Sequence, residues 1–279
     1  MLKKLMKYEL RATARIFLPF FGALLVLSVL NRIFYSSRVD RMLDTLRQND
    51  KGLPIEIVRI LSAVIFVFLI CAIFALTVIV MIQRYYKNLL GDEGYLMFTL
   101  PVKPWQLITS KMVISGMWLI VSGIVTVLAC LLLAAGIEDI VHIFMEIPGA
   151  LKTADSTQTF HNFLALFEVG ILLLVCLCDF ILLTYAAITV GQLWSSHKLL
   201  GAFGAFLALN TAFQIVTAFV TWAAGTTLDH IDFPGRWAND HAIALIHSGL
   251  WVVILWCALL GAVCFILSNQ LLQKRLNLE

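Results

Sequence analysis

Two carboxylates inside a long apolar stretch are the side chains of this sequence best placed to do chemistry. Glu168 and Asp179 lie eleven residues apart within segment 163–191. Eleven residues are close to three turns of an α-helix, so both side chains lie on one face. A carboxylate at the centre of a bilayer costs roughly 2.5–3.5 kcal/mol. Such acids either line a polar cavity and bind a cationic group of a substrate, or form hydrogen bonds that pack helices together. For Glu168 we prefer the second interpretation, a hydrogen bond that packs helices together. Both interpretations stay open for Asp179.

A later apolar segment, 200–224, carries a stripe of polar side chains at helical spacing. These are Asn210, Gln214, Thr217 and Thr221, at i, i+4, i+7 and i+11. The opposite side carries a stripe of small residues: Gly201, Ala205, Ala208 and Ala212. Small residues allow close approach of two helices. The polar stripe would then face a substrate pathway, but the alternative, in which Asn210 and Gln214 only join helices by hydrogen bonds, is preferred.

The remaining reactive residue types show no pattern of a metal centre or of catalysis. The closest group, His230, Asp232, Asp240 and His241, matches no standard metal-site spacing. All six cysteines lie in apolar stretches, so we expect no disulfide framework. The sequence has no G-x-x-x-x-G-K-[ST] motif for nucleotide binding. We expect no metal, no cofactor and no enzymatic activity in this chain.

The elements that hold these residues are predicted by composition. Hydrophobic residues make up 61% of the 279 residues, charged residues 13%, and the net charge is +3, with a mean hydropathy of +0.93. This is the composition of an all-α integral membrane protein, and it gives no support for nucleic-acid binding. A single transmembrane domain covering 1–279 is expected, with six spans at about 14–35, 56–83, 112–137, 163–191, 200–224 and 242–267.

The first fifteen residues form a predicted amphipathic helix. Lys3, Lys7, Arg11 and Arg15 repeat every four residues, and apolar side chains lie on the other side. This pattern is typical of a helix in the interface of an anionic membrane surface. With six spans both termini lie on one side, and the excess of basic residues there predicts that this side is the cytoplasm.

The connection between the second and third spans is unlike an ordinary loop. Gly91 and Gly94 flank Asp92 and Glu93, and a short apolar run, 95–100, follows before Pro101. Pro104 is placed to be the first residue of the next helix. A short apolar helix at the membrane surface can bind in the groove of a soluble partner through Tyr95, Leu96, Phe98 and Leu100. The alternative is an interfacial or re-entrant loop without a partner.

This connection also resembles a known family. The run 88–102, followed by Gln106, Leu107 and Lys111, resembles the signature of ABC-2 type permeases, and segment 187–193 with Lys198 is a weaker second match. The family has six spans, an amphipathic N-terminal helix and a coupling helix between spans two and three. The resemblance implies that the coupling segment contacts an ATPase through Gly91, Asp92, Glu93, Gly94, Tyr95, Leu96, Phe98, Thr99, Leu100 and Pro101. Lys103 departs from the family, where a helix-capping Ser is common, and this affects only the cap.

The resemblance further implies what the chain works with. A separate ABC ATPase subunit would bind ATP and Mg²⁺, and a second copy or a related permease would complete the pathway in the bacterial cytoplasmic membrane. Export of a peptide, an antibiotic or another amphipathic compound is the expected function. Two other classes remain open: a noncatalytic membrane scaffold or sensor, and an intramembrane hydrolase that uses Asp179 or the histidines.

Overall fold

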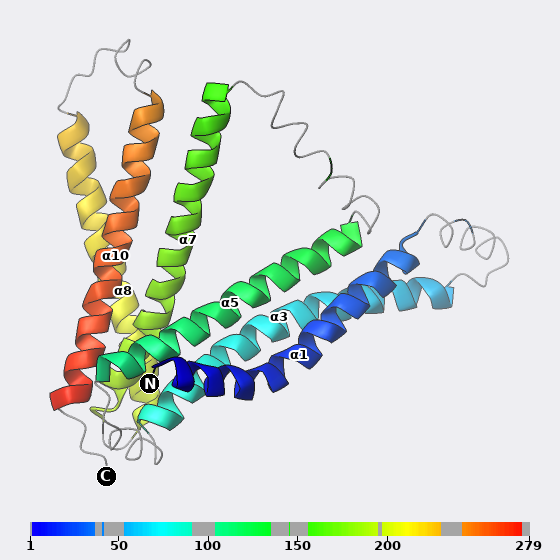
Figure 1. Ribbon diagram of the computed structural model, residues 1–279, viewed down its shortest axis with the longest axis horizontal. Coiled ribbons are helices and arrows are strands. Elements are labelled where there is room, and N and C mark those ends of the chain that lie inside the picture. The colour runs from blue at the N-terminus through cyan, green and yellow to red at the C-terminus, as the bar shows by residue number, and fades with distance from the viewer. Residues whose placement is uncertain are drawn as a thin grey trace. The chain divides into compact units, whose positions relative to one another are not determined.

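The chain is built from long α-helices. The computed structural model describes residues 2–36, 41, 53–90, 104–134, 145, 156–194, 197–229 and 242–274, and no strand occurs in these ranges (Figure 1). The helices are α1 (Leu2–Phe34), α3 (Leu53–Leu89), α5 (Pro104–Ala134), α7 (Ser156–Gly191), α8 (Lys198–Asp229) and α10 (Ala242–Lys274). Each contains a segment long and apolar enough to cross a membrane, six in all among the described residues. The predicted all-helical architecture with six spans is confirmed.

The helices extend beyond the spans predicted from hydropathy. Apart from the N-terminal part of α1, the largest extensions beyond the predicted spans are at α5, which begins at Pro104 against a span start of 112, at α7, which begins at Ser156 against 163, and at α10, which continues to Lys274 against 267. Helices of 31 to 37 residues are roughly 47–56 Å long at about 1.5 Å per residue, whereas the hydrocarbon layer is about 30 Å thick. The hydropathy of the sequence predicts only the apolar part of each helix, which would lie in lipid. The backbone hydrogen bonds of the helix continue beyond that part.

Helix α1 joins two elements that were predicted separately. It runs from Leu2 to Phe34 without a break, so the predicted interfacial segment 1–15 and the first span are one helix. No Gly or Pro interrupts residues 2–15, and Pro19 is accommodated within the helix, as membrane helices allow. Lys7, Arg11 and Arg15 are exposed on the side away from the buried face. Leu10 of the predicted apolar side is exposed as well, whereas Glu9 and Thr13 are buried. The predicted interfacial segment therefore does not form a helix of its own.

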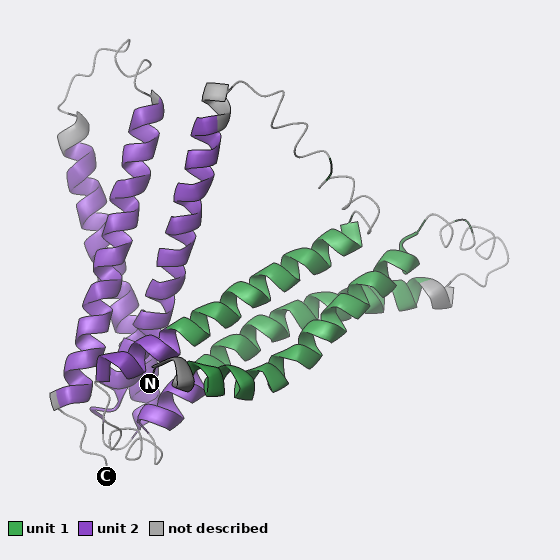
Figure 2. Cartoon of the chain, in the orientation of Figure 1, with its two compact units in different colours: residues 1–81, 113–154 green, residues 82–112, 155–279 purple. Residues whose placement is uncertain are grey.

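The described chain divides into two compact units, which Figure 2 distinguishes by colour. Unit 1 comprises residues 1–81 and 113–154, and unit 2 comprises 82–112 and 155–279. Helix α1 belongs to unit 1, helices α7, α8 and α10 belong to unit 2, and α3 and α5 contribute to both. Both residues that border the connection between α3 and α5, Leu90 and Pro104, therefore lie in unit 2.

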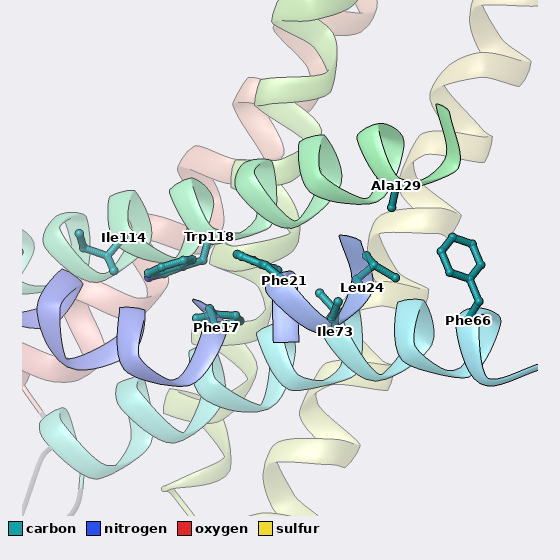
Figure 3. Packing of buried hydrophobic residues seen from close by; sticks show 8 residues of the cluster. All are labelled: Phe17, Phe21, Leu24, Phe66, Ile73, Ile114, Trp118 and Ala129. Carbon is teal, nitrogen blue, oxygen red and sulfur yellow. The ribbon is translucent and has the colours of Figure 1, made fainter. Parts of the chain in front are cut away.

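The core of unit 1 is formed by α1, α3 and α5. Figure 3 shows Trp118 of α5 against Phe17 of α1, with ring centroids 4.4 Å apart and an interplanar angle of 18°. The indole Nε1–H of Trp118 donates to Thr13 Oγ1 at 2.7 Å. The hydroxyls of Thr77 and Ser122 join α3 to α5 at 3.2 Å. Because lipid is as apolar as these side chains, such close packing and hydrogen bonds, rather than expulsion from water, hold the helices together.

In unit 2, α7 packs along both α8 and α10 (Figure 1). Helix α7 ends at Gly191, and the amides of Leu193 and Trp194 donate to carbonyls three residues back in a tight turn. A Cβ atom at Gly191 would overlap the backbone of Ala202 at the start of α8. Glycine at this position therefore permits the close approach of the two helices.

Candidate functional site

Asp179 borders a cavity of about 610 Å³ in unit 2. The cavity lies along α7 and α10, and Met112 of α5 also contacts it. Its walls are apolar and include Ile171, Leu174, Leu182, Ala258, Phe265 and Ile266. Among the described residues that line it, Asp179 is the only charged one. An apolar cavity of this size with a single polar group fits the usual composition of small-molecule sites.

The Asp179 carboxylate is held against a glycine of α10. Its Oδ1 atom occupies the place that a Cβ atom on Gly261 would take. The side chain is half-buried, and within the described part of the chain no hydrogen bond or ion pair is made by its oxygens. Asp179 therefore presents a carboxyl group without a hydrogen-bond partner among the described residues to an apolar space.

Glu168 has a different environment, although it lies on the same face of α7. Its side chain is 1% exposed. The Nδ1 atom of His247 lies 2.6 Å from Glu168 Oε2, and the Nε1–H of Trp251 donates to Oε1 at 3.0 Å. With the carboxylate ionised, the imidazole Nδ1–H is the donor. The Glu168 carboxylate thus joins α7 to α10, and it does not line the Asp179 cavity.

Sequence reasoning did not identify His247 and Trp251 as partners of Glu168. The two residues are separated by four positions, so they share one face of α10. This spacing of a ring nitrogen and an indole nitrogen in an apolar helix was a usable signal for a polar contact. What the sequence lacked was the alignment of α10 against α7.

The polar stripe of α8 does not lie in the cavity. Asn210 and Thr217 are half-buried, and Gln214 and Thr221 are exposed. Thr217 Oγ1 accepts from Trp256 Nε1 of α10 at 3.1 Å, and Thr221 donates to the carbonyl of Thr217 in its own helix at 2.9 Å. The structure therefore does not bring the predicted pathway residues of α7 and α8 together in one site.

The ten residues predicted to contact an ATPase, from Gly91 to Pro101, lie outside the described residues. The helices on both sides of them are described. Tyr85 of α3 is fully buried and stacks on Tyr185 of α7, with centroids 3.9 Å apart and an interplanar angle of 10°. The hydroxyls of Tyr85 and Thr189 lie 2.9 Å apart. This aromatic pair and its hydrogen bond attach the end of α3 firmly to α7.

The start of α5, on the other side of this segment, is also packed within unit 2. Helix α5 begins at Pro104, as predicted. Within its first turns Leu107 is 2% exposed and Ile108 is fully buried. Both ends of the connection are therefore embedded in unit 2, the unit that holds the Asp179 cavity.

No group of three or more His, Cys, Asp or Glu side chains within the described ranges is arranged to hold a metal ion. The cluster His230, Asp232, Asp240 and His241 lies outside these ranges. The six cysteines are free thiols.

The composition and the six apolar helices define a multi-pass, all-helical membrane protein. Comparison with known proteins found no matching family, no matching curated protein and no matching solved structure.

Proposed function

We propose that this chain is the transmembrane permease subunit of an ABC transporter, and that it couples a separate ATPase to the movement of an amphipathic compound. The proposal is supported by the resemblance of segment 88–102 to the ABC-2 permease signature. It is carried by one structural observation: both flanks of that segment are buried in the unit that contains the cavity at Asp179.

The contacts at these flanks suit the transfer of force. A displacement of segment 91–102 would act on the end of α3 and the start of α5. The Tyr85–Tyr185 stack and the hydroxyl contact with Thr189 connect the end of α3 to α7, and α7 supplies Asp179. Packed aromatic rings and buried hydrogen bonds resist deformation, so they pass on a movement rather than absorb it.

The sequence has no nucleotide-binding motif, so in this proposal a partner ATPase binds ATP and Mg²⁺. A second copy of the chain, or a related permease, forms the other half of the pathway. Closure of the two ATPase subunits drives alternating access through the coupling segments. The complex resides in the bacterial cytoplasmic membrane with both termini cytoplasmic, and it exports a peptide, an antibiotic or another amphipathic compound.

The first test is affinity purification of the chain from its native membrane, followed by mass spectrometry and an ATPase assay. We expect a stoichiometric nucleotide-binding subunit. The double variant Glu93→Lys/Tyr95→Ala should lose this subunit while it still inserts into the membrane. Trp222→Ala, which removes an exposed aromatic side chain near the end of α8, is the control and should retain it. Retention by the double variant would refute the assignment of the coupling segment.

The second test separates a permease from a membrane scaffold. The purified complex is reconstituted into vesicles, and ATP-dependent flux of candidate amphipathic compounds is measured. A scaffold would retain the ATPase subunit yet move nothing. A hydrolase would instead act without the partner, so turnover of a peptide or lipid by the isolated chain would overturn the proposal.

A further inference from the structure

We propose that the cavity between α7 and α10 binds a lipophilic cation, with Asp179 as the counter-charge. The ligand class is a compound with one positive charge, such as an amine or an onium group, on a large apolar body. This inference rests on the proposed function, because it names the class of compound that the permease takes up. It is nevertheless a statement about binding, and it can be tested without a partner ATPase.

The apolar part of the argument comes from the walls. A volume of about 610 Å³ lies within the range of roughly 300–1,000 Å³ that is usual for small-molecule sites. Leu174, Ala258 and Ile266 line the cavity and are also exposed at the surface of the unit. The cavity is therefore open at its side, so an apolar molecule dissolved in the lipid can enter it.

The charge of the ligand follows from Asp179. Its carboxylate lies beside aliphatic walls and has no hydrogen-bond or ion-pair partner within the described ranges. In apolar surroundings an unpaired carboxyl group favours its neutral form, whereas a cation within contact distance stabilises the carboxylate. An anion of the same shape would be repelled by that carboxylate. The cavity should thus discriminate by the sign of the charge and not only by size.

Gly261 positions this carboxylate. Because Oδ1 of Asp179 fills the place of a Cβ atom at residue 261, a methyl group there would displace the carboxylate without changing the charge of the site. The chain therefore offers two independent perturbations of the same interaction. Asp179→Asn removes the charge, and Gly261→Ala moves it.

A lipid acyl chain or a helix of a second copy could also cover these apolar walls. An acyl chain offers the Asp179 carboxyl group no polar partner, and a second copy offers one only through a polar side chain. Neither occupant predicts selective binding of a cation. If either is the natural occupant, cation binding will not depend on Asp179. The test below separates these cases.

The experiment uses the full chain in nanodiscs of zwitterionic phosphatidylcholine. Equilibrium dialysis measures binding of tetraphenylphosphonium and of tetraphenylborate, two ions of the same shape and opposite charge, and empty nanodiscs are subtracted. We expect saturable binding of the cation only. Asp179→Asn and Gly261→Ala should each weaken it roughly tenfold, or about 1.4 kcal/mol.

Three further variants serve as controls. Asp179→Glu keeps the charge and should retain most of the cation binding. Ala258→Phe fills the cavity from its exposed side and should abolish binding while the charge remains. Glu56→Gln, the same kind of charge removal on α3 in unit 1, should leave binding unchanged.

The proposal is overturned if Asp179→Asn binds the cation as the native chain does, or if the two ions bind equally well. Failure of the proposed function gives a different result: Asp179-dependent cation binding persists, but no ATPase co-purifies and no ATP-driven flux follows. Conversely, a transporting complex whose cation binding ignores Asp179 would retain the permease assignment and lose this site.

Discussion

The two acids of α7 should respond differently when each carboxylate is replaced by an amide. Glu168→Gln and Asp179→Asn each replace a carboxylate by an amide on one face of one helix. Glu168 accepts two hydrogen bonds from α10, at 2.6 and 3.0 Å. Asp179 accepts none from the described residues. We expect Glu168→Gln to destabilise the protein and Asp179→Asn to leave its stability nearly unchanged.

The magnitude follows from the number and type of these bonds. Hydrogen bonds between membrane helices contribute about 0.6 kcal/mol on average and up to about 1.7 kcal/mol in double-mutant cycles. In Glu168→Gln the amide oxygen can still accept from the Trp251 Nε1–H, whereas the amide nitrogen bonds to His247 only if the imidazole changes to the tautomer in which Nδ1 accepts. The charge assistance is lost as well. A loss of about 1–2 kcal/mol is therefore expected, against less than about 0.5 kcal/mol for Asp179→Asn.

The assay is unfolding in mixed micelles with a rising fraction of sodium dodecyl sulfate, followed by tryptophan fluorescence. A double-mutant cycle of Glu168→Ala with Trp251→Phe should give a coupling energy of about 0.6–1.7 kcal/mol. Equal destabilisation by Glu168→Gln and Asp179→Asn would refute the reasoning, and so would a coupling energy indistinguishable from zero.

Three further predictions concern packing, and all are read by the same unfolding assay. Gly191→Ala should cost about 1–3 kcal/mol, because its methyl group would overlap the backbone of Ala202. Trp118→Phe should cost about 1–2 kcal/mol, because it keeps much of the ring stack but removes the donor to Thr13. Tyr85→Phe should cost about 0.6–1.7 kcal/mol through its lost hydroxyl contact, and in the assembled complex it should lower ATP-driven flux more than retention of the ATPase.

The predictions for Gly191→Ala and Trp118→Phe each have a control. Gly204→Ala places the same methyl group on α8 where nothing lies within 4 Å, and it should be neutral or slightly stabilising because alanine favours the helix. Trp222→Phe changes a side chain that is 65% exposed and should have little effect. Gly191→Ala as stable as Gly204→Ala would contradict the proposed close approach of α7 and α8. A Tyr85→Phe variant with normal flux would contradict the role of this contact in coupling.

The number and type of the helices could be predicted because they depend on local properties of the sequence. A run of about 20 apolar residues satisfies its backbone hydrogen bonds within lipid only as a helix. The start of α5 at Pro104 was equally local, since proline suits the first turn of a helix. The ends of the other helices were less predictable, because the backbone continues its hydrogen bonds where the apolar run has already ended.

The candidate site was only partly predictable. Helical spacing correctly placed Glu168 and Asp179 on one face of α7, the face that meets α10. It could not tell that one carboxylate meets an imidazole and an indole while the other meets a glycine. These partners are 79 or more residues away along the chain, and no periodicity within α7 or α10 aligns the two helices.

The amino-acid sequence thus specifies six apolar helices with few charged residues. It also identifies Glu168 and Asp179 as the two carboxylates within one of them. These features depend on lipid as the solvent and on the geometry of a single helix. Both can be read from residues that are close together in the sequence. The packing of α7 against α10 separates a structural acid from an acid at the edge of a cavity. That distinction depends on which side chains of one helix stand opposite those of another, and this register is set by the fit of the whole interface rather than by any local pattern.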